Sequence, residues 1–157
     1  MYAATTSVAL VGGEARPVRV EAHVGRQSEA FKLSGLPDTA VREAKDRVRA
    51  AVASTGIRFP NRTVTVNLAP ADLPKRGTDY DLPIALGILA ASREIPPLHD
   101  AVVVGELALD GAVDGDAARG KFQRNRGCIG ACRRNRAGGG DGIEAIKGAA
   151  IGEIIPM

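Results

Sequence analysis

Tryptophan is absent from this sequence of 157 residues, and aromatic residues make up only 3% of it. The hydrophobic core must therefore be built from Val, Ile, Leu and Ala, which the 45% hydrophobic content supplies in sufficient amount for one domain. Cysteine and histidine are also scarce. Cys128 and Cys132 have no histidine near them in the sequence, because the two histidines are His23 and His99. This spacing does not indicate a metal site, and free thiols fit a reducing compartment.

Long apolar runs are missing as well. The longest, residues 82–91, is well short of the roughly 20 residues that a membrane span requires. The N-terminus has no basic segment ahead of its apolar residues, so it does not resemble a secretory signal. We therefore expect a cytoplasmic protein without a membrane partner.

The excess of positive charge is confined to the C-terminal part of the chain. Residues 1–113 hold 13 Lys and Arg and 13 Asp and Glu, whereas residues 114–157 hold 8 and 5. One hypothesis is therefore a small nucleic-acid-binding module in which the basic tail acts as an electrostatic arm.

The tail also differs in pattern, because residues 114–141 show neither a period of 2 nor one of 3.6. "GDAARGKF", residues 115–122, matches the first seven positions of a phosphate-binding P-loop, but Phe122 stands where Ser or Thr should bind Mg²⁺. We expect no nucleotide binding there. The Arg- and Gly-rich composition is one that GC-rich coding DNA gives when it is read out of frame, so one hypothesis is a frame-shifted, irregular tail. A natural flexible arm is the alternative.

The first 34 residues alternate as strands do. "RPVRVEAHV" places Val18, Val20, Ala22 and Val24 on one face, with His23 on the solvent side. "TSVALVGG" before it and "AFKLSG" after it predict two more strands, so we expect an antiparallel meander.

The next segment has the period of a helix. Val41, Ala44, Val48, Val52 and Thr55 share one face, and Arg42/Asp46 and Glu43/Arg47 form i,i+4 pairs on what we expect to be a solvated face. Pro37 and Asp38 mark its start, and Gly56 marks its end.

A strand, a charged loop and a second helix follow. "RTVTVNLAP" turns Val64, Val66 and Leu68 inward, and "DLPIALGILAAS" is apolar almost all round, as in a helix buried on most sides. "AVVVGELALDGAV" predicts a strand and a hairpin with Asp110-Gly111 at the turn. The order β-β-β-α-β-α-β is that of an α+β domain with one sheet and both helices on one face.

Three stretches in this order carry a family resemblance: "SGLPDTAVREAKDRVRAAV", "FPNRTVTVNLAPADLPKRGTDYDLPIALGILAAS" and "VVVGELALDG". Together they resemble the N-terminal domain of the ComM/YifB family, the magnesium-chelatase ChlI-like AAA+ ATPases, over roughly residues 4–113. The resemblance implies a β-α-β fold related to the Lon protease C-terminal domain and to ribosomal-protein domain 2. That fold has one sheet of four or five strands with two helices on one face.

The resemblance also implies a function. In the full family an AAA+ ATPase domain that uses ATP and Mg²⁺ follows, members form rings, and ComM is linked to branch migration of DNA during natural transformation. Here residues 1–113 correspond to the Lon-like domain, residues 114–157 form the atypical tail, and the ATPase domain is absent. We therefore expect a noncatalytic accessory domain without a cofactor of its own. The implied partners are a motor domain in the same or a separate chain, further copies in a ring, and DNA.

The loop "KRGTDYD" decides the expectation about catalysis. In Lon-like proteases this loop carries a nucleophilic Ser, and a Lys after the "GE" strand is the base. Lys75 and Gly77 match that pattern, but Asp79 occupies the position of the Ser, and Lys121 falls in the aberrant tail. A carboxylate has no hydroxyl from which to form an acyl-enzyme. A protease is therefore not expected, and a sugar-type kinase is disfavoured because no Gly-rich phosphate loop is present.

Two interpretations of the loop stay open. In the first, Asp79 or Asp81 caps the second helix, while Lys75 and Arg76 are solvated charges. In the second, Lys75, Arg76, Gly77, Asp79 and Asp81 contact a partner, which is a neighbouring subunit, a nucleic acid or the motor domain.

Overall fold

The computed structural model describes residues 1–98, 101–114, 127–130, 132–134 and 143–145. The elements are β1 (Tyr2–Val11), β2 (Glu14–Val24), β3 (Ala30–Ser34), α1 (Thr39–Ser54), β4 (Thr63–Ala69), α2 (Asp81–Ala91), β5 (Ala101–Val104), β6 (Glu106–Leu107), β7 (Val113–Asp114), β8 (Gly127–Gly130), β9 (Cys132–Arg134) and β10 (Ile143–Ala145).

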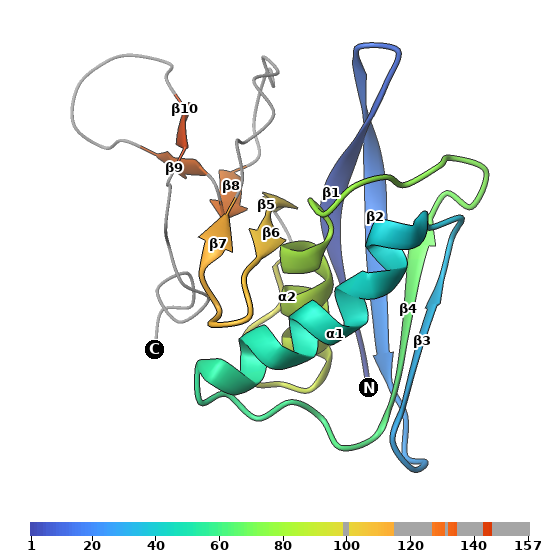
Figure 1. The fold of residues 1–157 in the computed structure, drawn as a ribbon, viewed down its shortest axis with the longest axis vertical. Coiled ribbons are helices and arrows are strands. Elements are labelled where there is room, and N and C mark those ends of the chain that lie inside the picture. Colours follow the sequence, from blue (N-terminus) through green and yellow to red (C-terminus); the bar gives the residue numbers. More distant parts are fainter. Residues whose placement is uncertain (99–100, 115–126, 131, 135–142, 146–157) are drawn as a thin grey trace.

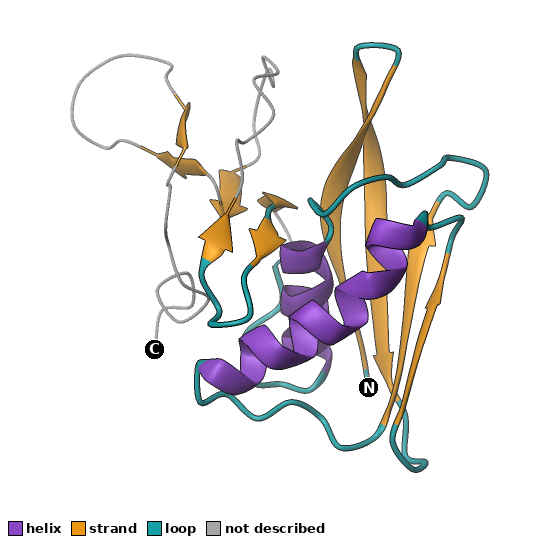
Figure 2. Ribbon diagram, in the orientation of Figure 1, coloured by secondary structure: helices purple, strands orange, loops and turns teal. Residues whose placement is uncertain are grey.

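One mixed sheet forms the body of the domain, with strand order β3-β4-β2-β1-β5 and β8 added at the β5 edge. β2 pairs antiparallel with β1 and with β4, whereas β5 is parallel to β1. Both helices lie on the same side of this sheet (Figures 1 and 2). The predicted α+β fold class is therefore confirmed, with a main sheet and two helices on one face. The described residues also form two small two-stranded sheets, β6-β7 and β9-β10, which were not predicted as separate sheets.

The predicted antiparallel meander of the first three strands is wrong at its third strand. β3 does not pair with β2; it pairs in parallel with β4, which lies between them. The reason is the helix between β3 and β4. A strand, a helix and a second strand form a crossover unit whose two strands run parallel, so β4 takes the place beside β2 and β3 becomes the edge.

α1 follows its sequence pattern. The Asp38 side chain accepts a 2.8 Å hydrogen bond from the Val41 amide and so caps the first turn, and Gly56 follows the C-cap residue Thr55 with φ at +78°. Its buried residues are Val41, Ala44, Val48, Ala51 and Val52.

α2 is buried along its whole length, as its nearly uniform apolar composition predicts, and all eleven of its residues are inaccessible or nearly so. It packs on β1 and β2, where Val18, Val20 and Ala22 are fully buried. The Thr5 hydroxyl of β1 donates to the Pro83 carbonyl at 3.0 Å, which adds a polar link inside this contact. The core therefore lies between the sheet and α2, with α1 over it.

Most of the atypical tail lies outside the described residues, including the P-loop-like residues 115–122. Where it is described, it contains short strands: β8 pairs in parallel with β5, and β9 pairs antiparallel with β10. This differs from the irregular structure expected at 127–130 and 132–134. Strand pairing uses backbone groups, so an apolar side-chain pattern is not required for it.

The close approach of two backbones at the end of β3 generates a stability prediction. Gly35 has φ at +100°, and a Cβ there would lie 2.1 Å from the Leu68 carbonyl oxygen. Gly12 in the β1–β2 turn also has positive φ, at +57°, but a Cβ there would meet no atom within 4 Å.

Gly35→Ala should therefore lower the free energy of unfolding by about 2–4 kcal/mol, through overpacking and backbone strain. Gly12→Ala should cost only about 1 kcal/mol, because the positive φ strains the backbone there but the added methyl group meets no other atom. Urea unfolding of both variants measures the difference, and equal losses would contradict the predicted clash.

Candidate functional site

The loop between β4 and α2, residues 70–80, is tied to the segment that precedes α1. The Lys75 amide donates to the Leu36 carbonyl at 3.3 Å, and the Asp38 amide donates to the Lys75 carbonyl at 3.0 Å. These two bonds form a parallel bridge between Pro37 and Lys75. The loop is therefore held by backbone contacts at its middle.

Lys75 is not a solvated charge, so the first interpretation is wrong for this residue. Its side chain is fully buried, and its Nζ donates to the Pro70 carbonyl at the start of the same loop. Burial lowers the pKa of the Lys75 amine. An alternation pattern cannot reveal this, because a charged residue in a Pro- and Gly-rich loop is normally exposed.

The exposed part of the loop is its next stretch. Arg76, Gly77 and Asp79 are exposed, and Thr78 is half-buried. The Gly77 amide donates to Oδ2 of Asp38 at 3.1 Å, while Oδ1 of Asp38 caps α1. Asp38 thus joins the tip of the loop to the start of the first helix.

Neither Asp79 nor Asp81 caps α2 as predicted. The N-cap residue is Tyr80, which makes no side-chain capping bond. The amides at the start of the helix already have backbone partners: Asp81 N donates to the Thr78 carbonyl at 3.1 Å, and Leu82 N donates to the Gly105 carbonyl at 3.0 Å. A carboxylate is therefore not needed to satisfy these donors.

Asp81 instead forms a buried ion pair with Arg47 of α1. Arg47 Nε donates to Oδ2 at 2.6 Å and Nη2 donates to Oδ1 at 2.9 Å, while the Leu107 amide donates to Oδ2 at 3.3 Å. The Asp81 side chain is completely buried, and that of Arg47 is 20% exposed. The expectation that the charges of α1 all lie on a solvated face is therefore wrong for Arg47.

Hydrogen bonds to both oxygens of Asp81 favour the ionised form of this carboxyl. Burial raises the pKa of the Asp81 carboxyl, and the bonds from Arg47 and Leu107 act in the opposite direction. The hydrogen bond with Asp81 raises the pKa of Arg47, which is protonated at any physiological pH. A single carboxylate in an otherwise apolar helix is a sequence signal for a cationic partner. The sequence does not show which residue that partner is, because Arg47 lies 34 positions before Asp81.

Thr78, Asp79 and Glu106 form the outer side of the site. The Thr78 hydroxyl donates to Oε2 of Glu106 at 2.7 Å. Although Asp79 is exposed as a residue, partial burial of its carboxyl raises its pKa, and the nearby Glu106 carboxylate adds to the effect. Gly105 N donates to the Asp79 carbonyl at 2.9 Å, which holds this part of the loop against the start of β6.

This arrangement has no activated nucleophile of the serine–lysine type. Asp79 offers a carboxylate, and the Lys75 amine is enclosed within its own loop. The Thr78 hydroxyl donates to Glu106 and not to a lysine amine, so this pair is not a dyad of the serine–lysine type. Of the five residues predicted to contact a partner, Arg76, Gly77 and Asp79 are exposed enough for direct contact, while Lys75 and Asp81 support the loop from within.

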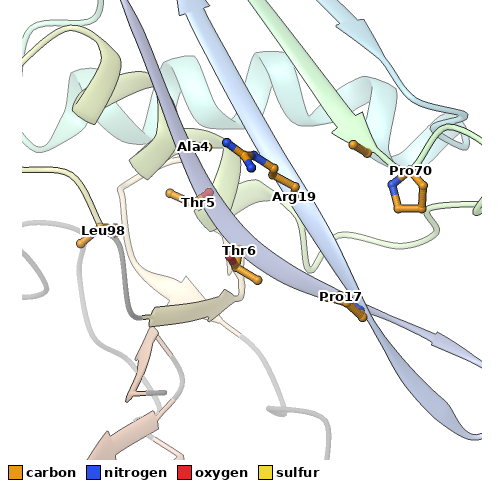
Figure 3. Close-up of a pocket in the computed structure, with 8 residues that line it drawn as sticks. Ala4, Thr5, Thr6, Pro17, Arg19, Pro70 and Leu98 are labelled. Carbon is orange, nitrogen blue, oxygen red and sulfur yellow. The ribbon is translucent and has the colours of Figure 1, made fainter. Parts of the chain in front are cut away.

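A second feature lies on the open face of the sheet, away from the helices. It is a hollow of about 580 Å³. Figure 3 shows side chains that line it: Ala4 and Thr6 lie on β1, Pro17 and Arg19 on β2, and Pro70 and Leu98 in neighbouring loops. Among the described residues that line it, Arg19 is the only charged one.

Beside this hollow, a row of hydrogen bonds crosses four strands. Ser34 donates to Asn67 at 3.0 Å, Asn67 donates to Glu21 at 3.0 Å, and Tyr2 donates to Glu21 at 3.1 Å. The bond from Asn67 lowers the pKa of Glu21, with further contributions from Tyr2 and Arg19. Sequence alternation identified the solvent side of β2 but not this network, whose members come from separate strands.

Comparison with known proteins gives the family. The family model described as subunit ChlI of Mg-chelatase matches residues 20–120, which is more than half of the chain. The chain belongs to this family. The segment matched includes α1, the loop, the buried pair and the hairpin formed by β6 and β7.

Individual relatives agree with that assignment. The chain is 48% identical over 109 residues to the uncharacterised protein YifB of Escherichia coli, and 47% identical over 111 residues to competence protein ComM of Haemophilus influenzae. An uncharacterised protein of Mycobacterium tuberculosis is 41% identical over 109 residues. These matches cover 68–69% of this chain but only 22% of each relative. The resemblance to the ComM/YifB family is confirmed, and the chain spans about a fifth of its relatives' length.

In the described part of the chain, no helix has the length and apolar composition needed to cross a membrane.

The raised pKa of Asp79 generates a pH prediction. A carboxyl whose pKa is higher in the folded state binds a proton more tightly there than in the unfolded state. The contribution of Asp79 to the free energy of unfolding is therefore most favourable when the pH is below its unfolded-state pKa of about 3.9. Stability is lost as the pH rises from this value through the folded-state pKa.

Asp79→Asn should consequently raise the Tm at pH 7, and the gain should disappear below about pH 4. Asp46→Asn removes the same charge from an exposed position on α1 and serves as the control. Thermal unfolding across this pH range measures both. An equal or smaller gain at pH 7 for Asp79→Asn than for Asp46→Asn would contradict the assignment.

Proposed function

We propose that this chain is a noncatalytic, Lon-like accessory domain of a cytoplasmic ComM/YifB-type AAA+ ATPase that acts as an ATP-driven motor on DNA during natural transformation. ATP and Mg²⁺ serve the motor domain in this proposal. The accessory domain contributes the exposed tip of the loop, residues 76–79, as a contact surface for the motor or a neighbouring subunit.

The observation that carries the proposal is the state of the loop where Lon-like proteases place their nucleophile. Asp79 takes the place of the Ser, and the Lys75 amine is fully buried against the Pro70 carbonyl. A hydrolytic site needs an exposed nucleophile with an adjacent base. The loop has the rigidity of such a site without these groups, which favours a binding role.

The relatives support the family-level part of the proposal. The matched region in each is about a fifth of a longer protein, and one relative carries the name competence protein. The alternative, a nucleic-acid-binding module that uses the basic tail, stays a prediction, because most of residues 114–157 lie outside the described part of the chain.

A chimera tests the proposal. The matching N-terminal segment of Haemophilus influenzae ComM is replaced by residues 1–113 of this chain, and the transformation frequency is measured. The chimera should support transformation. Thr78→Ala or Asp79→Ala should lower the transformation frequency no more than Arg76→Ala does, because these side chains contribute to contact and not to a reaction. Asp81→Ala should lower both the Tm of the domain and the transformation frequency, because it removes the buried partner of Arg47.

Two results would contradict the proposal. If the chimera is stably produced but inactive, the domain does not serve this role. If Thr78→Ala or Asp79→Ala leaves the Tm unchanged but removes activity, while Arg76→Ala does not, the loop acts catalytically and the noncatalytic assignment is wrong.

A further inference from the structure

A cluster of positive charge lies at the end of the sheet where β2 turns into β3. The turn, residues 25–29, is bonded to the segment that leads into β4. Gly25 N donates to the Thr63 carbonyl at 2.8 Å, Thr63 N donates to the Gln27 carbonyl at 3.2 Å, and the Thr63 hydroxyl donates to the Ser28 carbonyl at 2.7 Å. These contacts join the two segments into one surface. We call residues 25–34 and 57–63, together with Arg49, the basic end.

The charge of the basic end is strongly one-sided. It contains five cations, namely Arg26, Lys32, Arg49, Arg58 and Arg62, and one acid, Glu29, which gives a net charge of +4. The other positions of residues 1–113 hold eight cations and twelve acids, a net charge of −4. The net charge of residues 1–113 is therefore zero only because the positive basic end is balanced by negative charge elsewhere in the domain.

These cations are accessible and mostly unneutralised. Arg49 pairs with Glu29, and its side chain is 44% exposed. Arg26, Lys32, Arg58 and Arg62 are exposed, and none of them forms an ion pair with a described residue. Arg26 and Arg62 belong to the two segments that are bonded to each other at this end of the sheet, so their exposed charges attract an anionic partner there.

The chemistry of the basic end favours phosphate over an acidic protein. Four of its five cations are arginines, whose forked guanidinium group binds phosphate oxygens in pairs. A protein interface is usually centred on exposed apolar anchors, and the large exposed apolar residues of the described chain all lie outside the basic end.

A rigid aromatic base supports this surface. The rings of Phe31 and Phe59 stack with centroids 6.4 Å apart, and the Arg49 guanidinium lies 5.3 Å from the centre of the Phe59 ring. Both phenylalanines are half-buried. Aromatic rings combined with arginines at a surface are typical of sites that follow a single strand by its phosphates and stack its bases.

We propose that the basic end binds the sugar–phosphate backbone of a single-stranded nucleic acid without reading its sequence. Apart from Arg49, which lies in α1, a turn, an edge strand and the segment before β4 form it, and this shape does not suit insertion of a recognition helix into a groove. The site is separate from the loop of residues 70–80 and does not depend on whether that loop contacts a motor domain.

The test uses the full chain, with the tail present in every variant, and a fluorescein-labelled oligothymidylate as the probe. Binding is measured by fluorescence anisotropy over a series of salt concentrations. The double variant Arg26→Gln/Arg62→Gln removes two charges from the basic end. The matched control Arg16→Gln/Arg42→Gln removes two exposed charges elsewhere, and the Tm of each variant confirms folding.

The basic-end variant should bind about tenfold or more weakly at low salt, and the slope of log K against log salt should fall by roughly 1.4, since each phosphate contact on a single strand contributes about 0.7. The control should change affinity less than about twofold. Absence of binding by the natural chain, or equal losses in the two variants, would overturn the proposal. Equally tight binding of polyglutamate would also overturn it, because the site would then be one for acidic proteins.

Discussion

The buried bond between Arg47 and Asp81 is the constraint on which the arrangement of α1, α2 and the β5–β6 connection depends. Asp81 is fully enclosed in an apolar helix, so its charge is tolerable only with donors around it. Two come from Arg47 and one from the Leu107 amide, so three separate elements must meet at this carboxylate. Gly105, just before β6, lies close to α2, since a Cβ there would lie 3.3 Å from a methyl group of Leu82. Breaking such a pair leaves an uncompensated charge inside the protein.

The Arg47–Asp81 pair and the backbone bonds around it, which we call the clamp, also fix the position of the loop of residues 70–80. Gly105 receives and donates the backbone bonds that hold Asp79 and Leu82, while Asp38 bonds Gly77 and caps α1. The loop is thus fixed at both of its sides, and the buried Lys75 amine fixes its interior. What remains for contact is a short exposed tip. We propose that this tip contacts the motor domain or a neighbouring subunit, and that the basic end binds nucleic acid on a different part of the domain.

Sequence patterns predicted the helices and strands better than they predicted which strands and side chains contact each other. The apolar period predicts which face of a strand or helix is buried. The structure confirms this for residues 18–24, 39–55 and 63–69. Pairing is a different matter: β3 joins β4 because a helix separates them, and no local pattern contains that information. The same holds for Arg47 with Asp81, and for Lys75, whose burial results from the loop folding over it. Contacts between residues far apart in sequence are set by the whole fold.

The clamp is tested most directly by a double-mutant cycle on Arg47 and Asp81, with the free energy of unfolding measured in urea. Arg47→Met and Asp81→Asn should each cost about 3 kcal/mol or more, because each leaves one buried partner without its bonds. The double variant should cost little more than one single change, which corresponds to a coupling energy of about 2–3 kcal/mol. Single losses below about 0.5 kcal/mol that simply add would show that the pair does not hold the three elements together.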